Sequence, residues 1–169
     1  MNNGSPPPGT RLVPLTAQEV RLAATLNAEA VSDAPTVPLW TIEDLLIWLD
    51  LPGVRGWLAL VDEKPAGWLL VRRTGDETEI LTIAVHPRAR RRGIARHLIE
   101  YTARAAARCG ARRLVLEVSA EAPGALALYR ATGFEKIGRR AGYYTARGRD
   151  DRVDAFVLER VLVATPPQD

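Results

Sequence analysis

The stretch ILTIAVHPRARRRGIARHLIE, residues 80–100, decides the fold, because it runs from a strand through a basic loop into a helix. Its first part is an apolar, strand-like run, and an amphipathic helix begins at Ile94 directly after Gly93. Free backbone N–H groups and the positive end of the helix dipole make such a helix start a site for anions. Gly93 allows close approach of the backbone, and arginines at positions 88, 90, 91 and 92 add positive charge. The stretch therefore predicts a cradle for a pyrophosphate.

Two other interpretations of the arginine loop are a solvated charge run and a nucleic-acid contact. The loop is not a Walker loop, because no Gly-Lys-Ser/Thr follows, and it has one glycine where a Rossmann turn needs three. Nothing resembling a helix-turn-helix or an aromatic stacking surface accompanies the charge. The order of strand, loop and amphipathic helix favours the phosphate interpretation and disfavours nucleic acid.

The composition indicates one domain with a local positive charge. A chain of 169 residues is long enough for a single domain with its own hydrophobic core. The formal net charge is +3, and nine of the 21 arginines lie between Arg88 and Arg113 while acidic residues are spread widely. We therefore expect a local anion site and not a basic surface.

The few cysteines and histidines exclude several kinds of site. Cys109 is the only cysteine, so it forms no internal disulfide or multi-cysteine metal site, and we expect it to be buried in a cytoplasmic protein. His86 and His97 are too few for a metal site or a triad, and we expect both to be surface groups. No apolar run approaches the roughly 18 residues that span a bilayer, and the N-terminus lacks the apolar core of a signal peptide, so we expect no membrane association.

The ends of the chain are predicted to be flexible tails around one folded region. Residues 1–10 and 164–169 contain Pro, Gly and small polar residues with little to bury, which leaves residues 11–163 as the domain. Helical spacing of apolar residues predicts one helix that begins with a Thr16/Glu19 capping box, and another that begins at Thr41. We therefore expect two helices before any strand.

A mixed arrangement of strands and helices follows. The segments 56–62, 66–73 and 78–86 are rich in strand formers and separated by short turns, which predicts an antiparallel meander. After the helix from Ile94 we expect a buried strand over 113–118, a helix from Pro123, and two final strands, the last over 153–163. Antiparallel and crossover connections are mixed in one sheet, so the predicted class is α+β (mixed α/β).

The motifs in this order resemble the GNAT superfamily of N-acetyltransferases. RxxGxA, from Arg90 to Ala95, resembles the superfamily's motif A, which wraps the pyrophosphate of acetyl-coenzyme A (acetyl-CoA). LEVSAEAPGALALYRATGF (116–134) and GYYTARGRDDRVDAFVLER (142–160) are similar to segments of the ribosomal-protein alanine N-acetyltransferase group, and the match covers about residues 12–162. The resemblance implies a central, mostly antiparallel twisted sheet, flanked by helices and splayed in the middle to admit acetyl-CoA.

The resemblance also implies which residues bind the coenzyme. The strand before motif A would supply backbone N–H groups to the thioester carbonyl and the pantetheine arm. After LEV the group usually carries an asparagine that touches the pantetheine arm, and the matching position here is Ala122. The expected coenzyme-binding residues are Ile83, Ala84, Val85, Arg90, Arg91, Arg92, Gly93, Ile94, Ala95, Arg96, Ala122 and Tyr129.

Two or three side chains carry the expected chemistry. Glu117 lies in the apolar strand LVLEV, where an unpaired carboxylate is costly and so is often functional. The resemblance makes Glu117 the base, acting through water, and Tyr129 of ALY the acid for the thiolate leaving group. Glu79 is the rival base, as it matches the base of branches that act on lysine. The structural alternatives are a core aromatic for Tyr129 and a strand-end surface carboxylate for Glu79.

The acceptor is expected to be an α-amine. An α-amine with a pKa near 8 costs only about 1 kcal/mol to deprotonate at pH 7, whereas lysine, near 10.4, costs about 4 to 5 kcal/mol. A base reached through water therefore suffices for a protein N-terminus. The resemblance of PLWTIEDL (38–45) to the group's substrate helix, and of the paired tyrosines, implies substrate contact for Trp40, Tyr143 and Tyr144.

Three hypotheses about function follow. The first is a metal-free enzyme that transfers the acetyl group of acetyl-CoA, by direct attack in a ternary complex, to the N-terminal α-amine of an alanine in a protein such as a ribosomal protein. The second keeps the reaction but changes the acceptor to a small amine, an antibiotic or a lysine side chain, and is motivated by Ala122. The third is a non-catalytic acyl-CoA sensor or a nucleic-acid-binding module. The sequence leaves open whether the protein is a monomer or a dimer.

Overall fold

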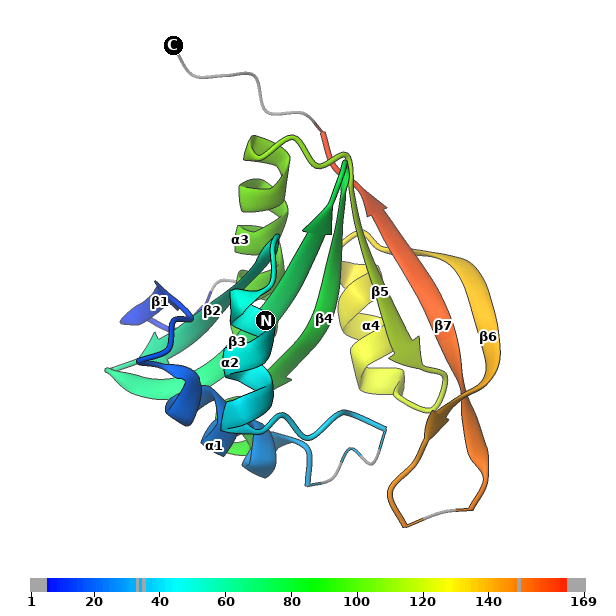
Figure 1. Ribbon diagram of the computed structural model, residues 1–169, viewed down its shortest axis with the longest axis horizontal. Helices are drawn as coiled ribbons and strands as arrows, with labels where there is room; N and C mark the ends of the chain where they lie inside the picture. Colours follow the sequence, from blue (N-terminus) through cyan, green and yellow to red (C-terminus); the bar gives the residue numbers. More distant parts are fainter. Residues whose placement is uncertain (1–5, 33, 35, 149, 164–169) are drawn as a thin grey trace.

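The protein has three layers, with one sheet between two pairs of helices (Figure 1). The computed structural model describes residues 6–32, 34, 36–148 and 150–163. Residues 1–5 of the predicted N-terminal tail and all of the predicted C-terminal tail, 164–169, lie outside the described residues. The α+β class predicted from the order of elements is confirmed.

The sheet has seven strands in the order β1-β2-β3-β4-β5-β7-β6. Five of the six neighbouring strand pairs are antiparallel, and β4 with β5 is the one parallel pair, as the crossover through helix α3 requires. The strands are β1 (Thr10–Pro14), β2 (Val54–Val61), β3 (Lys64–Thr74), β4 (Glu77–Val85), β5 (Arg113–Ser119), β6 (Glu135–Thr145) and β7 (Arg152–Val161).

The sheet splays apart in its middle, between β4 and β5. The parallel pairing begins at Glu77 and Arg113 and stops at Ile80 and Leu116, so the rest of β4 runs on without β5. Leu81 is an extra residue in β4, because Thr82 pairs with Leu70 while Ile80 pairs with Val71. Such a bulge bends a strand and increases its local twist, and it lies where the two strands part. The predicted splay is confirmed, and Figure 1 shows β4 and β5 diverging toward α4.

The helices form two separate cores on the two faces of the sheet. Helices α1 (Val20–Ala30) and α2 (Ile42–Asp50) pack on β2 and β3 around fully buried side chains such as Leu45 and Trp68. Helices α3 (Ile94–Arg108) and α4 (Pro123–Ala131) pack on the opposite face around Leu98, Leu114 and Leu116. Burial of these apolar faces fixes the distance between the helix starts and the splayed strands.

The structure corrects the expected start of the chain. Strand β1 precedes both helices and begins at Thr10, the last residue of the predicted tail, so the expectation of two helices before any strand is wrong. This five-residue edge strand is too short to carry an alternating pattern, and it ends at Pro14, a residue that edge strands tolerate. The backbone N–H and the hydroxyl of Thr16 both donate to the Glu19 carboxylate, but the Thr16 hydroxyl accepts from the N–H of Gln18 instead of Glu19, and helix α1 begins only at Val20.

The expected burial of Cys109 is also wrong. Cys109 is the C-cap of α3 and is exposed, because the helix ends at Arg108 and the next residue, Gly110, turns away with a φ of 85°. The apolar face predicted for this helix included Cys109, one residue beyond the true end of α3, and at that position the side chain no longer faces the core.

Candidate functional site

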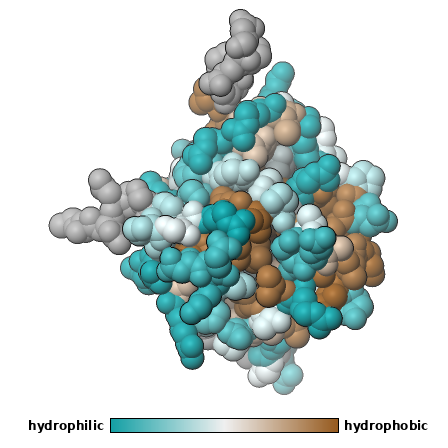
Figure 2. All heavy atoms as spheres, turned by 90° about the vertical axis from the view of Figure 1, so that its left-hand side faces the viewer, coloured by the Kyte–Doolittle hydropathy of each residue, from teal (hydrophilic) through white to brown (hydrophobic). Residues whose placement is uncertain are grey.

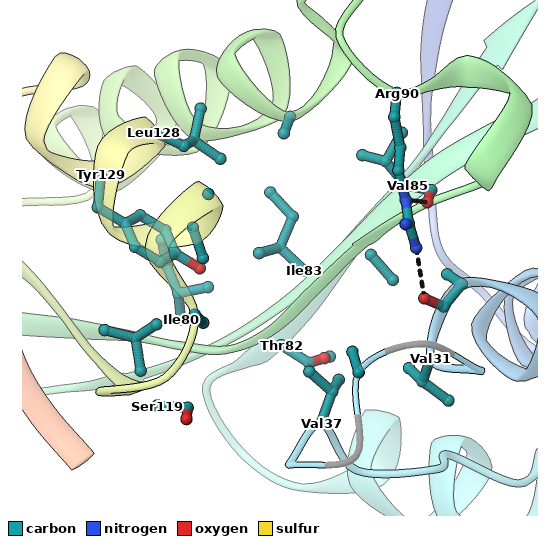
Figure 3. A pocket seen from close by; sticks show the side chains of 18 of the residues that line it. Val31, Val37, Ile80, Thr82, Ile83, Val85, Arg90, Ser119, Leu128 and Tyr129 are labelled. Carbon is teal, nitrogen blue, oxygen red and sulfur yellow. Dashed lines mark hydrogen bonds between the residues drawn. The ribbon is translucent and has the colours of Figure 1, made fainter. Parts of the chain in front are cut away.

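A cavity of about 800 Å³ lies in the splay between β4 and β5. Its walls come from six parts of the chain, and Figure 3 shows side chains of several of them pointing into it. The lining residues are 80–85 of β4, 89–96 of the basic loop and the start of α3, 117–119 of β5, 122, 124, 125 and 127–129 of α4, and Tyr144 of β6, with 30, 31, 34 and 36–38 closing the remaining side.

The start of α3 presents backbone N–H groups to this cavity. The first N–H of the helical ladder belongs to His97 and donates to the carbonyl of Gly93 over 2.9 Å, so those of Ile94, Ala95 and Arg96 precede it. Gly93 is the N-cap in the left-handed conformation, with a φ of 80°, and has no side chain to cap the helix. Arg91 also has a positive φ, 61°, which curls the loop around the helix start. This arrangement of backbone N–H groups fits a pyrophosphate.

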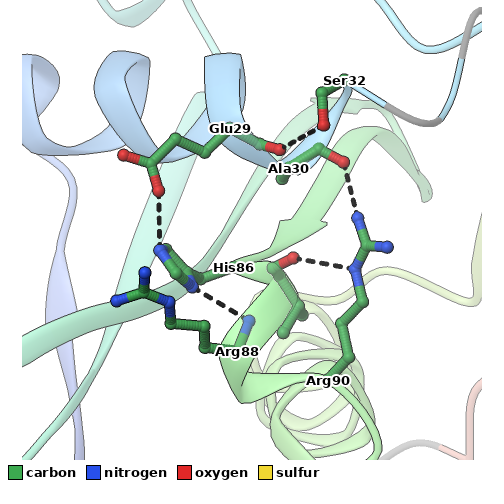
Figure 4. A network of polar contacts seen from close by, with 7 residues as sticks. Glu29, Ala30, Ser32, His86, Arg88 and Arg90 are labelled. Atoms are coloured by element: carbon green, nitrogen blue, oxygen red, sulfur yellow. Dashed lines mark hydrogen bonds and ion pairs between the residues drawn. The ribbon is translucent and has the colours of Figure 1, made fainter.

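The arginines of the loop have different tasks. Arg90 lies across the loop and donates from Nη2 to the carbonyl of Ala30 at 2.7 Å and from Nε to that of Val85 at 3.4 Å (Figure 4). Its planar fork thus joins α1, the end of β4 and the loop. Arg91, Arg92 and Arg96 line the cavity with exposed side chains, which leaves them available for an anion.

His86 was expected to be a surface group, but it is half-buried, and both of its ring nitrogens have partners. Its Nε2 lies 2.7 Å from a carboxylate oxygen of Glu29, and its Nδ1 accepts the backbone N–H of Arg88 at 3.1 Å (Figure 4). The acceptor role of Nδ1 places a proton on Nε2, which faces Glu29. His86 thereby caps the short 3₁₀ turn Pro87–Ala89 and ties it to α1. His97 is half-buried on α3, and burial lowers its pKa, with the charge of Arg104 as a second cause.

The free part of β4 supplies the second backbone surface of the cavity. Ile83, Ala84 and Val85 pair with β3 on one side, while the last β5 partner of β4 is at Ile80. The polar groups of this open strand edge can therefore pair with the amide groups of an extended ligand. The structure brings together all the predicted coenzyme-binding positions, Ala122 included, on the wall of this one cavity.

Tyr129 points from α4 into the cavity, with its hydroxyl directed away from the helix (Figure 3). Its ring is buried and meets Phe134 edge to face at 5.6 Å. Burial raises the pKa of the Tyr129 phenol far above its usual range, and nearby Tyr144 raises it further. A phenol held protonated in this way can serve as a proton donor.

Glu117 lies on the cavity wall within a small polar cluster. Nε of Arg140 lies 2.6 Å from Oε1 of Glu117, and the Tyr143 hydroxyl bonds to the same carboxylate and has its pKa raised by it. Burial raises the pKa of Tyr144 strongly, with the Glu117 charge as the next cause. The buried-strand carboxylate predicted to be costly is therefore partnered, and it remains open to the cavity.

Glu79, the rival base, lies outside the cavity lining. Glu79 pairs with Val115, two residues before Glu117 on β5, so the two carboxylates share one face of the sheet. Glu79 is half-buried, and its pKa is raised first by burial and then by the charge of Glu117. Of the two candidate bases, Glu117 lines the cavity and Glu79 does not.

The three predicted substrate residues have different positions. Strand β6 is irregular between Arg140 and Tyr144, and the inserted residues turn Tyr144 into the cavity while Tyr143 reaches Glu117. Trp40 does not line the cavity. It packs edge to face on Trp48 at 5.7 Å and on Trp68 at 6.3 Å, at the margin of the α1–α2 core.

Sequence reasoning missed the side of the cavity formed by residues 31, 34 and 36–38 between α1 and α2, called here the α1–α2 connection. It also missed Arg140 and Arg147, whose partners lie on other elements. The residues of this connection that line the cavity are all uncharged, so nothing in the sequence marks them as part of a site. The partners of Arg140 and Arg147 depend on strand register and on the path of the connection. The only usable signal was the abundance of proline in this segment, which indicates an irregular path.

Other features offer no competing centre. A second groove, between β1 and α2, is lined largely by apolar residues, and Figure 2 shows apolar patches among hydrophilic side chains on the side of the molecule where β1 lies. Among the residues that the structure describes, no group of three or more His, Cys, Asp or Glu is placed to hold a metal ion. No helix in the described ranges is long and apolar enough to cross a membrane.

The splayed sheet and the anion-binding helix start define a class of α+β proteins built to hold a long, phosphate-bearing ligand between two strands. The model of the acetyltransferase (GNAT) family matches residues 22–134, so the chain belongs to this family. The family resemblance predicted from the motifs is confirmed.

Several known proteins are similar to this chain. It is 36% identical over 93 residues to the ribosomal protein bS18-alanine N-acetyltransferase of Salmonella typhimurium. The matched segment covers 54% of this chain and 63% of that protein. It is 42% identical over 84 residues to the N-alpha-acetyltransferase RimI of Mycobacterium tuberculosis, covering 50% and 49%. The matched segments thus span less than two thirds of these curated relatives. The crystal structure of the ribosomal-protein-S18-alanine N-acetyltransferase from Escherichia coli superposes with a TM-score of 0.81 at 23% identity, over 95% of this chain and 99% of that one.

Proposed function

We propose that this protein transfers the acetyl group of acetyl-CoA to the N-terminal α-amine of a protein, with an alanine-starting ribosomal protein as the preferred acceptor. The observation that carries the proposal is the convergence of four features on one cavity: the N–H groups of α3, the open edge of β4, Glu117 and Tyr129. The names of the curated relatives supply the acceptor class. A cytoplasmic location, expected from the single cysteine, is part of the same proposal.

The coenzyme supplies an activated acetyl thioester, and this chain's residues hold it. The N–H groups from Arg91 to Arg96 bind the pyrophosphate, and the exposed arginines of the loop add charge around it. The open edge of β4, from Ile83 to Val85, pairs with the pantetheine amides and directs backbone N–H groups at the thioester carbonyl. The residues present therefore fit the coenzyme, although Ala122 provides no side-chain amide at the position where the group usually has one.

The proton transfers are assigned to two side chains. Glu117 receives the proton that the attacking amine loses, through a water, and Arg140 and Tyr143 hold the carboxylate in place. Tyr129 stays protonated because burial raises its pKa, and it gives its proton to the departing sulfur. Tyr144, on the same wall, orients the acceptor.

A thiol-release assay with the purified protein tests the proposal. The substrates are a peptide that starts with alanine, the same sequence with a blocked N-terminus and an internal lysine, and a set of small polyamines and aminoglycosides. We expect turnover with the free alanine peptide to exceed turnover with every other amine. Faster turnover with the blocked lysine peptide or with a small amine would show that the proposed acceptor is wrong and that the acetyl-transfer reaction is right. Binding of acetyl-CoA without release of the CoA thiol in the presence of any of these amines would rule out the proposed enzymatic function.

A further inference from the structure

The hairpin of β6 and β7 is joined to the opposite side of the cavity by one side chain, Arg147. Arg147 follows β6 and is exposed, next to the fully buried Ala146, which anchors the hairpin in the domain. Its Nη1 donates to the carbonyl of Val37 at 2.7 Å. Its Nη2 donates to the carbonyl of Val31 at 2.6 Å and to that of Ala34 at 3.2 Å. These contacts span more than a hundred residues of sequence.

The acceptors of these bonds explain why an arginine is needed. Val31 is the C-cap of α1, where backbone carbonyls have no helical partner and the helix dipole is negative. The last turn of α1 contains no basic residue of its own. Arg147 brings a charge from another element, and its planar fork reaches three carbonyls at once, which a lysine ammonium on a flexible stem cannot do in the same geometry.

The segment that Arg147 holds is a wall of the cavity. Val31, Ala34 and Val37 line the cavity, while Arg147 does not and therefore acts through them. On its other side the α1–α2 connection is held by Asn27, whose Nδ2 donates to the carbonyl of Pro38 at 3.1 Å. Asn27 thus binds the connection from the core, at the carbonyl of Pro38, and Arg147 binds it from the hairpin, at the adjacent carbonyl of Val37. The contacts of these two side chains with the connection are called here the clasp.

This clasp fixes the distance between two groups of cavity residues. Tyr144 lies on the hairpin that carries Arg147, only three residues before it, and faces the cavity. The α1–α2 connection faces the cavity from the other side. The basic loop at the start of α3 is joined to α1 by a different arginine, Arg90, which donates to the carbonyl of Ala30.

The geometry points to Arg147 as the positioning residue that holds the α1–α2 connection at a fixed distance from Tyr144, and so sets the width of the opening through which the acceptor reaches the cavity. The inference rests on the proposed function for the identity of the acceptor. Without Arg147 the α1–α2 connection is held on one side only, and the opening widens.

Steady-state kinetics of Arg147→Ala, Arg147→Lys and Arg139→Ala test the role. Arg139 is the matched control, because it is an exposed arginine of the same hairpin that pairs within it, with Asp154. Loss of several charge-assisted bonds is expected to raise KM for the alanine peptide about tenfold in Arg147→Ala, with kcat and the KM for acetyl-CoA within about twofold of wild type. Arg147→Lys is expected to recover part of the effect, and Arg139→Ala none of it.

Hydrogen exchange of the α1–α2 connection provides a readout that needs no acceptor. The N–H groups of Ala34 and Val37, bonded to the carbonyls of Val31 and Ala34, are expected to exchange faster in Arg147→Ala and unchanged in Arg139→Ala. Unchanged exchange, an unchanged peptide KM, or an equal rise in the KM for acetyl-CoA would overturn the role of Arg147. If wild type acetylates no peptide, the proposed function fails, and the exchange measurement still decides whether the clasp exists.

Discussion

Arg140 and Glu117 form an ion pair, 2.6 Å from Nε to Oε1, that reaches over β7, because β5 and β6 are both paired to β7 and not to each other. The pair holds the carboxylate of Glu117 on the wall of the cavity. Glu79, the other carboxylate on this face, does not reach the cavity. The two carboxylates can therefore be separated by experiment.

Glu117→Gln is expected to lower kcat/KM for the alanine peptide about a hundredfold, because a positioned general base contributes about 10² to 10⁴ in rate. Glu79→Gln, the matched control, is expected to stay within about threefold of wild type, since its carboxylate touches neither the cavity nor the coenzyme site. Steady-state rates at saturating acetyl-CoA measure both. A larger loss in Glu79→Gln than in Glu117→Gln would reverse the assignment of the base.

Tyr129→Phe is expected to lower kcat about a hundredfold and leave acetyl-CoA affinity unchanged, because only the hydroxyl that protonates the leaving sulfur is removed. Calorimetric binding of acetyl-CoA and single-turnover rates measure the two quantities. Tyr101→Phe serves as the control, as Tyr101 packs edge to face on Trp57, away from the cavity lining. Full turnover in Tyr129→Phe would leave Tyr129 a packing residue only.

Gly93→Ala is expected to weaken acetyl-CoA binding about tenfold, because a Cβ in the left-handed conformation costs about 1 to 2 kcal/mol and distorts the helix start. Gly75→Ala is the control, since Gly75 also has a positive φ, 62°, and its added Cβ would meet nothing within 4 Å. Both variants are expected to lose similar stability, whereas only Gly93→Ala loses affinity. Equal affinities of the two variants would remove the α3 start from the coenzyme site.

Much of the fold was predictable because the signals were local. The periodicity of β2 to β4, the capping box at Thr41 and the glycine before α3 each depend on a few neighbouring residues, and all three are present in the structure. The edge strand β1 was missed, since five residues ending in proline give no periodic pattern. Its position depends on pairing with β2, a contact that the chain reaches only after two helices.

The site was predictable where it follows a motif and not where it follows register. The loop from Arg90 to Arg96 was placed correctly on the cavity wall from its order between strand and helix. Trp40, predicted to contact the substrate, lies outside the cavity lining and packs on Trp48 and Trp68, and no local pattern distinguishes an aromatic residue that packs in this way from one that faces a ligand. The partners of Arg140 and Arg147 depend on the irregular pairing of β6 and on the path of the α1–α2 connection, which no local pattern encodes.

The buried position of Glu79 predicts a pH-dependent stability difference. Its pKa is raised, so the folded state binds this proton more tightly than the unfolded state, and stability falls as pH rises from the unfolded value, about 4.3, through the folded one. Glu79→Gln removes this loss. In urea unfolding, we expect the variant and wild type to have similar free energies of unfolding near pH 4, below the unfolded pKa of Glu79. At pH 7 we expect the variant to be the more stable of the two. Glu135→Gln, at an exposed position, is the control, and a variant less stable than wild type at pH 7 would show that the Glu79 charge is favourably paired.

Ala122→Asn is expected to improve both stability and coenzyme binding. Ala122 is the N-cap of α4, its side chain makes no capping bond, and it lines the cavity next to the expected path of the pantetheine arm. An asparagine there can accept a backbone N–H of the first helical turn, which stabilises proteins by about 0.5 to 2 kcal/mol relative to alanine. Its amide N–H₂ can also donate to the pantetheine arm, which predicts a KM for acetyl-CoA lowered several-fold.

Ala122→Ser separates these two effects, because serine caps the helix but has no amide to reach the coenzyme. The midpoint temperature of thermal unfolding is expected to rise in both variants, whereas the KM for acetyl-CoA is expected to fall only with asparagine. A lower KM in both variants would mean that order at the start of α4, and not a pantetheine contact, limits coenzyme binding. A KM unchanged by asparagine would mean that the backbone edge of β4 alone holds the pantetheine arm, so that Ala122 in place of the usual asparagine costs this protein nothing.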